Sequence, residues 1–260
     1  MTRIVVNGHP TWAVVPKRKG KTVVLMHGGL SSSASLVRVL GAPLSKRFAV
    51  AAFDRRGHGR TADTDEPFSI ESMTDETIAF VELLDRRVHL VGHSDGANVA
   101  LSVAMRRPDL VKRVVAVGAN YHYSGLVPME DFTSESEGFA DFARKYAKYS
   151  PDGIEHAAVV VDKSARLAKT QPTMTTSQLA SIPVPVLVMV GDDDVARLEH
   201  TVSLYEALHE SQLAVVPGAS HAVWKEHTEE CVRVILRFLL GPVPPVTKYP
   251  LRRGDNGISH

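Results

Sequence analysis

Short apolar runs alternate with longer amphipathic segments along most of the chain. The apolar runs have the length and β-branched character of strands that are buried on both faces of a sheet; they occupy residues 22–26, 48–53, 88–91, 113–117, 186–190 and 213–216. Apolar positions at helical spacing lie between them, at residues 70–84, 95–106, 198–208 and 229–240. Residues 5–6 and 12–15 flank an Asn-Gly turn and predict an opening hairpin. The alternation predicts an α/β fold with a mostly parallel sheet and helices on both faces.

Two segments break this alternation. Residues 119–185 have no clear strand pattern but many aromatic residues, namely Tyr121, Tyr123, Phe132, Phe139, Phe142, Tyr146 and Tyr149. We expect a helical lid here, inserted between two parts of one core, residues 1–118 and 186–240. Residues 241–260 contain four prolines and no periodicity, and we expect an extended or disordered tail.

Composition narrows the class of protein. The chain has 260 residues, with 30 Lys and Arg against 29 Asp and Glu, so it has no excess of charge that would favour nucleic acid or an anionic membrane as a partner. A single cysteine, Cys231, excludes an intrachain disulfide. The N-terminus lacks the apolar core of a signal peptide, and no apolar run is long enough for a membrane span. We therefore expect a cytoplasmic protein, monomeric or homodimeric.

Residues 92–96 read Gly-His-Ser-Asp-Gly, the sole Gly-x-Ser-x-Gly string in the chain. It directly follows the strand at 88–91 and opens the helix at 95–106, which is the setting of a nucleophile elbow. A strand that turns at once into a helix strains the serine backbone, and flanking glycines let the two elements approach closely. We predict that Ser94 is a nucleophile held at the carboxyl edge of the sheet.

A serine hydroxyl needs a base, and in this type of site the acid and the histidine follow the serine along the chain. His221 follows the strand at 213–216 through a Pro-Gly turn, so it is the predicted base. His227 is the runner-up, although it lies where the next helix should begin. Residues 192–194, Asp-Asp-Asp, follow the strand at 186–190 and supply the acid; their position alone does not decide among them.

An acyl-transfer site also needs backbone N–H groups that stabilise an oxyanion. Asp95 follows the nucleophile, and its N–H is the first candidate donor. Residues 27–30, His-Gly-Gly-Leu, follow the strand at 22–26. They supply the second donor, with Gly29 preferred and Leu30 as the alternative.

Two other motifs suggest ligands that we do not expect. Residues 57–62, Gly-His-Gly-Arg-Thr-Ala, match a dinucleotide fingerprint, but a polar stretch rather than a helix follows them, so there is no helix terminus for a pyrophosphate. The three adjacent aspartates at 192–194 lack the spacing of a calcium loop and have no neighbouring His or Cys set. We predict no cofactor and no metal.

Together these motifs resemble α/β-hydrolases of the esterase, lactonase and cofactor-free haloperoxidase-like group. The resemblance covers roughly residues 1–240 and rests on five ordered motifs, at residues 27–29, 54–59, 92–96, 191–194 and 218–221. It implies the α/β-hydrolase fold and an acid at the end of a Gly-x-x-Asp step, which is Asp194. The usual Gly-x-Gly-His step is here Gly-Ala-Ser-His, a departure that keeps His221 but can alter the path of its loop.

Ser94-Asp95-Gly96 also looks like the valacyclovir-hydrolase (biphenyl-hydrolase-like) subgroup, in which the acid after the nucleophile faces a substrate amine. Asp95 is therefore a candidate selector of cationic esters, and the alternative is that it only stabilises the helix N-terminus. Leu30, Tyr121 and Trp224 are further candidates for contacts with substrate, against packing roles for Tyr121 and Trp224.

We therefore expect a serine hydrolase that cleaves a small-molecule carboxylic ester, lactone or thioester through an acyl-enzyme. Perhydrolase, haloperoxidase or C–C hydrolase chemistry with the same triad is the rival among enzymes. A non-catalytic ligand-binding receptor is the rival of another class.

Overall fold

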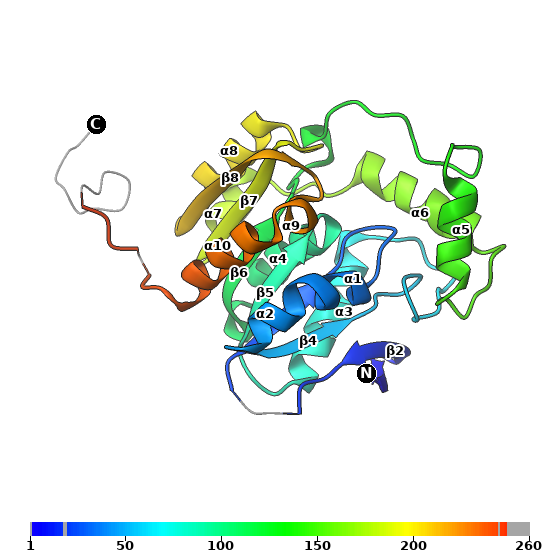
Figure 1. The fold of residues 1–260 in the computed structure, drawn as a ribbon, viewed down its shortest axis with the longest axis horizontal. Coiled ribbons are helices and arrows are strands. Elements are labelled where there is room, and N and C mark those ends of the chain that lie inside the picture. Colours follow the sequence, from blue (N-terminus) through cyan, green and yellow to red (C-terminus); the bar gives the residue numbers. More distant parts are fainter. Residues whose placement is uncertain (1, 18–19, 244, 249–260) are drawn as a thin grey trace.

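The computed structural model describes residues 2–17, 20–243 and 245–248 and is built around one eight-stranded sheet (Figure 1). The strands are β1 (Thr2–Val6), β2 (His9–Val14), β3 (Thr22–Met26), β4 (Ala49–Phe53), β5 (Val88–His93), β6 (Val111–Val117), β7 (Val186–Asp193) and β8 (Ser211–Ser220). Their order is β1-β2-β4-β3-β5-β6-β7-β8. The hairpin β1–β2 pairs antiparallel with β4, and all pairs from β4 to β8 are parallel. The predicted mostly parallel sheet is thus confirmed.

Side chains of the central strands alternate between two hydrophobic clusters, one on each face of the sheet. In β3, Val24 and Met26 belong to one cluster, and Val23 and Leu25 belong to the other. Every residue of β3 is buried. A strand covered on both faces needs an uninterrupted apolar sequence, which explains why these strands lack polar alternation.

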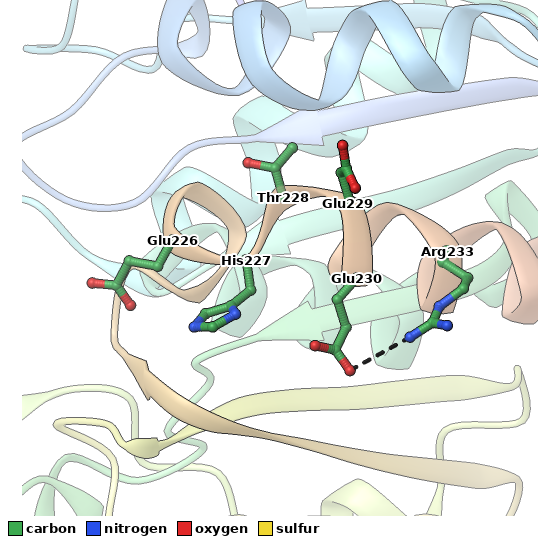
Figure 2. Close-up of a pocket in the computed structure, with 6 residues that line it drawn as sticks. All are labelled: Glu226, His227, Thr228, Glu229, Glu230 and Arg233. Carbon is green, nitrogen blue, oxygen red and sulfur yellow. Dashed lines mark ion pairs between the residues drawn. The ribbon is translucent and has the colours of Figure 1, made fainter.

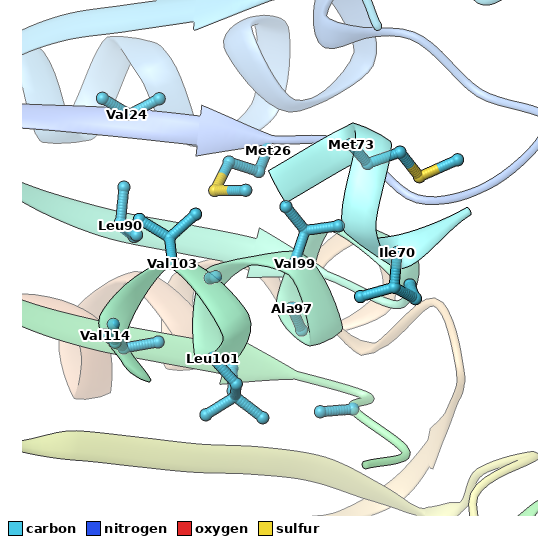
Figure 3. Close-up of a cluster of buried hydrophobic side chains, with 14 of the residues drawn as sticks. Val24, Met26, Ile70, Met73, Leu90, Ala97, Val99, Leu101, Val103 and Val114 are labelled. Atoms are coloured by element: carbon cyan, nitrogen blue, oxygen red, sulfur yellow. The ribbon is translucent and has the colours of Figure 1, made fainter. Parts of the chain in front are cut away.

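Helices cover the two faces. On the first, α3 (Ile70–Leu83), α4 (Asp95–Arg106) and α8 (Leu198–Ala207) supply buried residues to the first cluster. Figure 3 shows Ala97, Val99, Leu101 and Val103 of α4 lying close to strand residues such as Leu90. The opposite face is covered by α1 (Ser33–Leu36), α2 (Ala42–Ser45), α9 (Val223–Glu226) and α10 (Thr228–Leu240).

The helical run at 33–45 has no counterpart among the helices expected from the sequence. A five-residue π-helical stretch, Val37–Gly41, joins α1 to α2 without a break. Leu36, Leu40 and Leu44 recur every fourth residue and are all buried against the sheet. This spacing of leucines is typical of a helix, but Gly41 and Pro43 within the run are residues that ordinarily interrupt one.

Residues 119–185 hold α5 (Phe139–Ala147), α6 (Ala157–Thr170) and α7 (Thr176–Ala180) but no strand beyond two isolated bridges. Figure 1 shows α5 and α6 beside each other at the right of the view, away from β7 and β8. The buried Asp63 side chain, from the loop after β4, joins α6 to the core: it accepts hydrogen bonds from Lys163 (2.7 Å) and His156 (2.8 Å). That this segment acts as a lid stays a prediction.

Two expectations concern the ends of the chain and the membrane. Residues 241–243 and 245–248 contain neither helix nor strand, and the rest of the expected tail, 244 and 249–260, lies outside the described residues. Within the described ranges, every helix is too short or too polar to cross a bilayer.

Candidate active site

Ser94 lies at a strained turn between β5 and α4. Its φ of 55° and ψ of −123° fall where L side chains are rarely found. The two flanking glycines make the turn possible: a Cβ on Gly92 would lie 2.2 Å from the Gly96 carbonyl oxygen, and one on Gly96 would lie 2.3 Å from that of Met26. The Ser94 N–H donates to the Val117 carbonyl (2.8 Å). This is the geometry of a nucleophile elbow.

His221 and Asp194 form a hydrogen-bonded pair at the same edge of the sheet. The His221 Nδ1–H donates to Asp194 Oδ1 (2.7 Å), and the Ala196 N–H donates to the same oxygen (3.1 Å). The Asp194 side chain is only 1% exposed, whereas that of His221 is 28% exposed. Burial acts to raise the pKa of Asp194, but the His221 hydrogen bond and charge outweigh it and hold the pKa below its usual range.

The end of β6 lies between this pair and Ser94. Val117 bonds to Ser94, and the next residue, Gly118, has a φ of +59° and packs under the pair. A Cβ on Gly118 would lie 2.9 Å from the His221 ring and 3.3 Å from Asp194 Oδ2. The parallel strands β5, β7 and β8 therefore bring the three predicted triad residues to one edge, with the end of β6 between them.

The neighbouring aspartates have other surroundings. Asp192 accepts a hydrogen bond from the Ala219 N–H (3.2 Å), which ties the acid loop to the histidine loop, and Asp193 is exposed. Of the three, Asp194 is the one whose carboxylate reaches His221. Among the described residues, no group of three or more His, Cys, Asp or Glu side chains is arranged to hold a metal ion.

His227, the runner-up base, lies away from this pair. Its Nε2–H donates to the Gly218 carbonyl (3.2 Å). It lines a surface cleft of about 690 Å³ at the start of α10 together with Glu226, Thr228, Glu229, Glu230 and Arg233. Figure 2 shows these six side chains. The one ion pair drawn there joins Arg233 to Glu230 (3.7 Å).

His93 holds the histidine loop in place. Its Nε2–H donates to the His221 carbonyl (2.8 Å). Burial, and then the nearby His221, lower the pKa of His93 to about 4. A neutral His93 keeps the loop bonded without adding a charge beside the candidate base.

The loop after β3 packs directly on the elbow. A Cβ on Gly28 would lie 3.1 Å from Ser94 Cβ, and one on Gly29 would lie 2.6 Å from the Asp95 carboxylate. Only glycines allow this approach. The candidate donors, the N–H groups of Gly29 and Asp95, thus belong to two backbone segments in contact next to Ser94.

Arg55 fixes this loop from behind. Its guanidinium donates to the carbonyls of His27 (2.5 Å) and Gly28 (3.1 Å), and its own N–H donates to His27 Nε2 (3.1 Å). Arg55 is 1% exposed, and burial lowers its pKa although three carboxylates lie near it. With both carbonyls bound to Arg55, the loop is held in one orientation.

Asp95 is partly exposed, and its carboxylate lies against Gly29. Removal from water raises the pKa of Asp95, and the positive charges of Arg55 and His221 oppose that rise. A positively charged group is therefore already within electrostatic reach of this carboxylate, so a substrate amine is not needed to balance it.

The remaining candidates have different surroundings. Leu30 has a φ of 48° and lines a cleft that extends away from the Gly28-Gly29 loop. The Tyr121 ring stacks on His200 with a centroid distance of 4.0 Å, and its hydroxyl lies 3.0 Å from the Ser203 hydroxyl. Trp224 is 2% exposed and packs edge-on against His93 (5.6 Å). Contacts of these residues with substrate stay predictions.

Three residues with positioning contacts were missed by sequence reasoning. Arg55 belongs to the motif at 54–59, and its place directly after a buried strand was the available signal. His93 gave no signal beyond its place in the elbow. Glu226 accepts hydrogen bonds from the Ser220 N–H (2.8 Å) and hydroxyl (2.7 Å), and it thereby anchors the unusual Gly-Ala-Ser-His turn.

The fold agrees with that of known proteins. The chain belongs to the alpha/beta hydrolase family, whose model matches residues 23–234, and it is a serine hydrolase. The putative carbamate hydrolase RutD of Agrobacterium fabrum is 24% identical over 84% of this chain and 92% of its own. The 2-(acetamidomethylene)succinate hydrolase of Mesorhizobium japonicum is 28% identical over 89% of this chain and 92% of its own. The crystal structure of the enol-lactonase from Burkholderia xenovorans LB400 has the same fold, with a TM-score of 0.75 at 21% identity over 92% of this chain and 100% of that one.

Proposed function

We propose that this hydrolase cleaves carboxylic esters of small molecules through an acyl-enzyme on Ser94. His221 Nε2 takes the proton of the Ser94 hydroxyl as the oxygen attacks the carbonyl carbon. The N–H groups of Gly29 and Asp95 donate to the resulting oxyanion. The intermediate then expels the alcohol, which receives its proton from His221, and a water activated by His221 releases the acid.

The observation that carries this proposal is the buried Asp194 carboxylate bonded to His221 beside the strained Ser94 turn. The carboxylate orients the ring and stabilises the imidazolium that forms when the proton is taken. Since Nδ1 is occupied by Asp194, Nε2 is the nitrogen left to act on Ser94. The low pKa of Asp194 keeps it ionised at neutral pH, as this role needs.

Ester cleavage is the reaction that needs the fewest catalytic groups beyond the triad and the two oxyanion donors. An alcohol departs with one proton from the histidine, whereas an amine must be protonated before it leaves. Cleavage of a C–C bond must in addition stabilise a carbanion, and perhydrolysis needs peroxide in place of water. The described site supplies one base and two candidate oxyanion donors, which suffice for an ester.

A second candidate is hydrolysis of a C–N bond. The names of the two relatives above refer to a carbamate and to an acetamido compound. The same triad and oxyanion donors serve both reactions, so the bond that is cleaved depends on the substrate that the protein admits.

A fluorophosphonate probe followed by a substrate panel tests the proposal. The native protein should be labelled at Ser94 and should turn over 4-nitrophenyl esters faster than matched anilides, carbamates or C–C substrates. Labelling with faster cleavage of a carbamate or amide would establish the second candidate. Peroxide-dependent product would establish perhydrolysis. Absence of labelling in a folded protein would refute the enzyme and favour a ligand-binding receptor.

A further inference from the structure

A cleft of about 640 Å³ lies between the segment that follows the Gly28-Gly29 loop and helix α5. Leu30, Ser31 and Ser35 line one side of it, and residues of α5 and of the turn after it line the other. The size suits a small organic molecule. The proposed catalytic residues Ser94, His221 and Asp194 do not line this cleft, so it is a separate feature. It adjoins, at Leu30, the loop of residues 27–30, which we call the oxyanion loop.

The ionisable lining of the cleft is cationic. Arg38, Lys145 and Lys148 line it, and its lining includes no aspartate or glutamate. Lys145 and Lys148 are three residues apart at the end of α5 and therefore share a face of the helix. None of the three forms an ion pair with another residue in the described part of the chain.

This arrangement does not follow from the overall charge, because the whole chain has a formal net charge of only +1. Some other surface cations have carboxylate partners, including Arg106 with Asp75 and Arg107 with Glu82 and Asp109. Three unpaired cations around one cleft raise the local positive potential, which attracts anions into it.

Two acids that contact residues of the cleft are engaged elsewhere. Asp54, beneath Gly59, is fully buried and accepts hydrogen bonds from the Ser33 N–H and hydroxyl and from the Arg60 N–H. Asp152 accepts from the Asp63 N–H (2.8 Å) and the Tyr146 hydroxyl (3.2 Å). These carboxylates are therefore not free to neutralise Arg38, Lys145 and Lys148.

The other walls of the cleft suit the body of an organic anion. Phe142, Tyr146 and Tyr149 provide aromatic surface. His58 also lines the cleft, and it is 2% exposed with an Nε2 that has no partner among the described residues. Because its Nδ1–H donates to the Arg56 carbonyl (2.8 Å), Nε2 can only accept a hydrogen bond, as from a ligand hydroxyl or amide.

We propose that this cleft binds the carboxylate end of the substrate, so that the hydrolase prefers esters or amides that carry a second, anionic carboxylate. The inference rests on the proposed function for the identity of the scissile bond. Leu30 lines the cleft, and the backbone from Gly28 to Leu30 spans at most about 7 Å. Since Gly28 packs on Ser94 and Leu30 lines the cleft, we place the second carboxylate of a short dicarboxylic substrate in this cleft. The helical segment at 119–185, through α5, then closes the cleft over the substrate.

Kinetics with charge-matched substrates test this preference. The triple variant R38Q/K145Q/K148Q should lose about tenfold in kcat/KM for 4-nitrophenyl hemisuccinate, because exposed ion pairs each contribute modestly. It should change less than about twofold with neutral 4-nitrophenyl butyrate. The control K46Q/R47Q/K112Q removes the same charge at the amino ends of β4 and β6, the opposite edge, and should leave both rates unchanged. Equal losses for both esters, or equal losses in both triple variants, would overturn the proposal.

Binding to Ser94→Ala separates this proposal from the proposed function, because it needs no turnover. Glutarate should bind this variant more tightly than its dimethyl ester, and the three cleft substitutions should abolish the difference. Raised salt should also weaken glutarate binding. Glutarate binding without ester turnover in the native protein would refute the esterase and keep the anion site. No preference for glutarate over its diester would refute the anion site whatever the turnover.

Discussion

The catalytic edge and the cationic cleft are neighbours but are built in opposite ways. At the edge, Asp194 and Arg55 are 1% exposed and are bound to His221 and to backbone carbonyls. Around the cleft, Arg38 and Lys145 are exposed and have no ion-pair partner in the described ranges. In the proposed function, buried bonds fix where the reaction occurs, and in the further proposal exposed side chains bias which molecule arrives. Substitutions in the two regions should therefore differ by orders of magnitude in effect.

The largest effect should come from Ser94→Ala. Without the nucleophile, kcat should fall on the order of 10⁶-fold, because the other triad residues cannot act without it. Loss of fluorophosphonate labelling and stopped-flow ester kinetics measure this. Ser102→Ala, in the following helix, is the matched control and should retain normal turnover. A folded Ser94→Ala protein with near-native rates would show that the edge at Ser94 is not the catalytic site.

Asp194→Asn should come next, with a loss in kcat on the order of 10⁴-fold. The amide can donate to His221 Nδ1 and so favours the wrong tautomer for a base. Asp193→Asn, an exposed neighbour, should change kcat little, and the ratio of the two losses decides between Asp193 and Asp194. A larger loss from Asp193→Asn would show that Asp193, and not Asp194, is the acid of the triad.

Arg55→Met should lower kcat by about 100-fold and change KM little. The reason is that Arg55 holds the oxyanion loop, and a small displacement of the oxyanion donors lowers the rate by about that factor. A trifluoromethyl ketone, which mimics the oxyanion, should lose affinity in parallel with kcat. Arg56→Met leaves the loop carbonyls bonded and serves as the control, and Arg55→Lys provides a milder change if Met prevents folding. An effect on KM alone would show that Arg55 does not position the loop.

The last effect concerns the dependence of stability on pH. Glu76 is 2% exposed, and burial raises its pKa to about 7 despite Arg55 and Arg56. Because the folded state holds this proton more tightly than the unfolded state, Glu76 favours folding most below about pH 4.5 and loses that contribution as the pH rises to about 7. The loss amounts to roughly 3 kcal/mol in the free energy of unfolding.

Urea unfolding at pH 5 and pH 8 measures this effect. Glu76→Gln should lose the decline in stability between the two values and keep an oxygen that can accept from the Arg56 N–H. Glu71→Gln, exposed on the same helix, should retain the native decline. An unchanged decline in Glu76→Gln would show that Glu76 ionises normally beneath the oxyanion loop.

Much of the fold was predictable because strands buried on both faces need uninterrupted apolar runs. The runs at 22–26 and 186–190 became β3 and the start of β7, and the segment at 95–106 became α4. The helical run at 33–45 was missed because Gly41 and Pro43 masked its spacing of leucines. The spacing of apolar residues predicts a helix or strand well only where the segment contains no residue, such as glycine or proline, that ordinarily interrupts that element.

The sequence by itself determined that Ser94, residues 192–194 and His221 follow parallel strands and so meet at one edge, because the carboxyl ends of such strands share a side of the sheet. Only the tertiary structure decided how they are held. The bonds from Arg55 to the His27 and Gly28 carbonyls, and from His93 to the His221 carbonyl, join residues far apart in the chain. The cationic cleft also arises from two distant segments. Such contacts depend on how elements pack, which the periodicity of one segment does not encode.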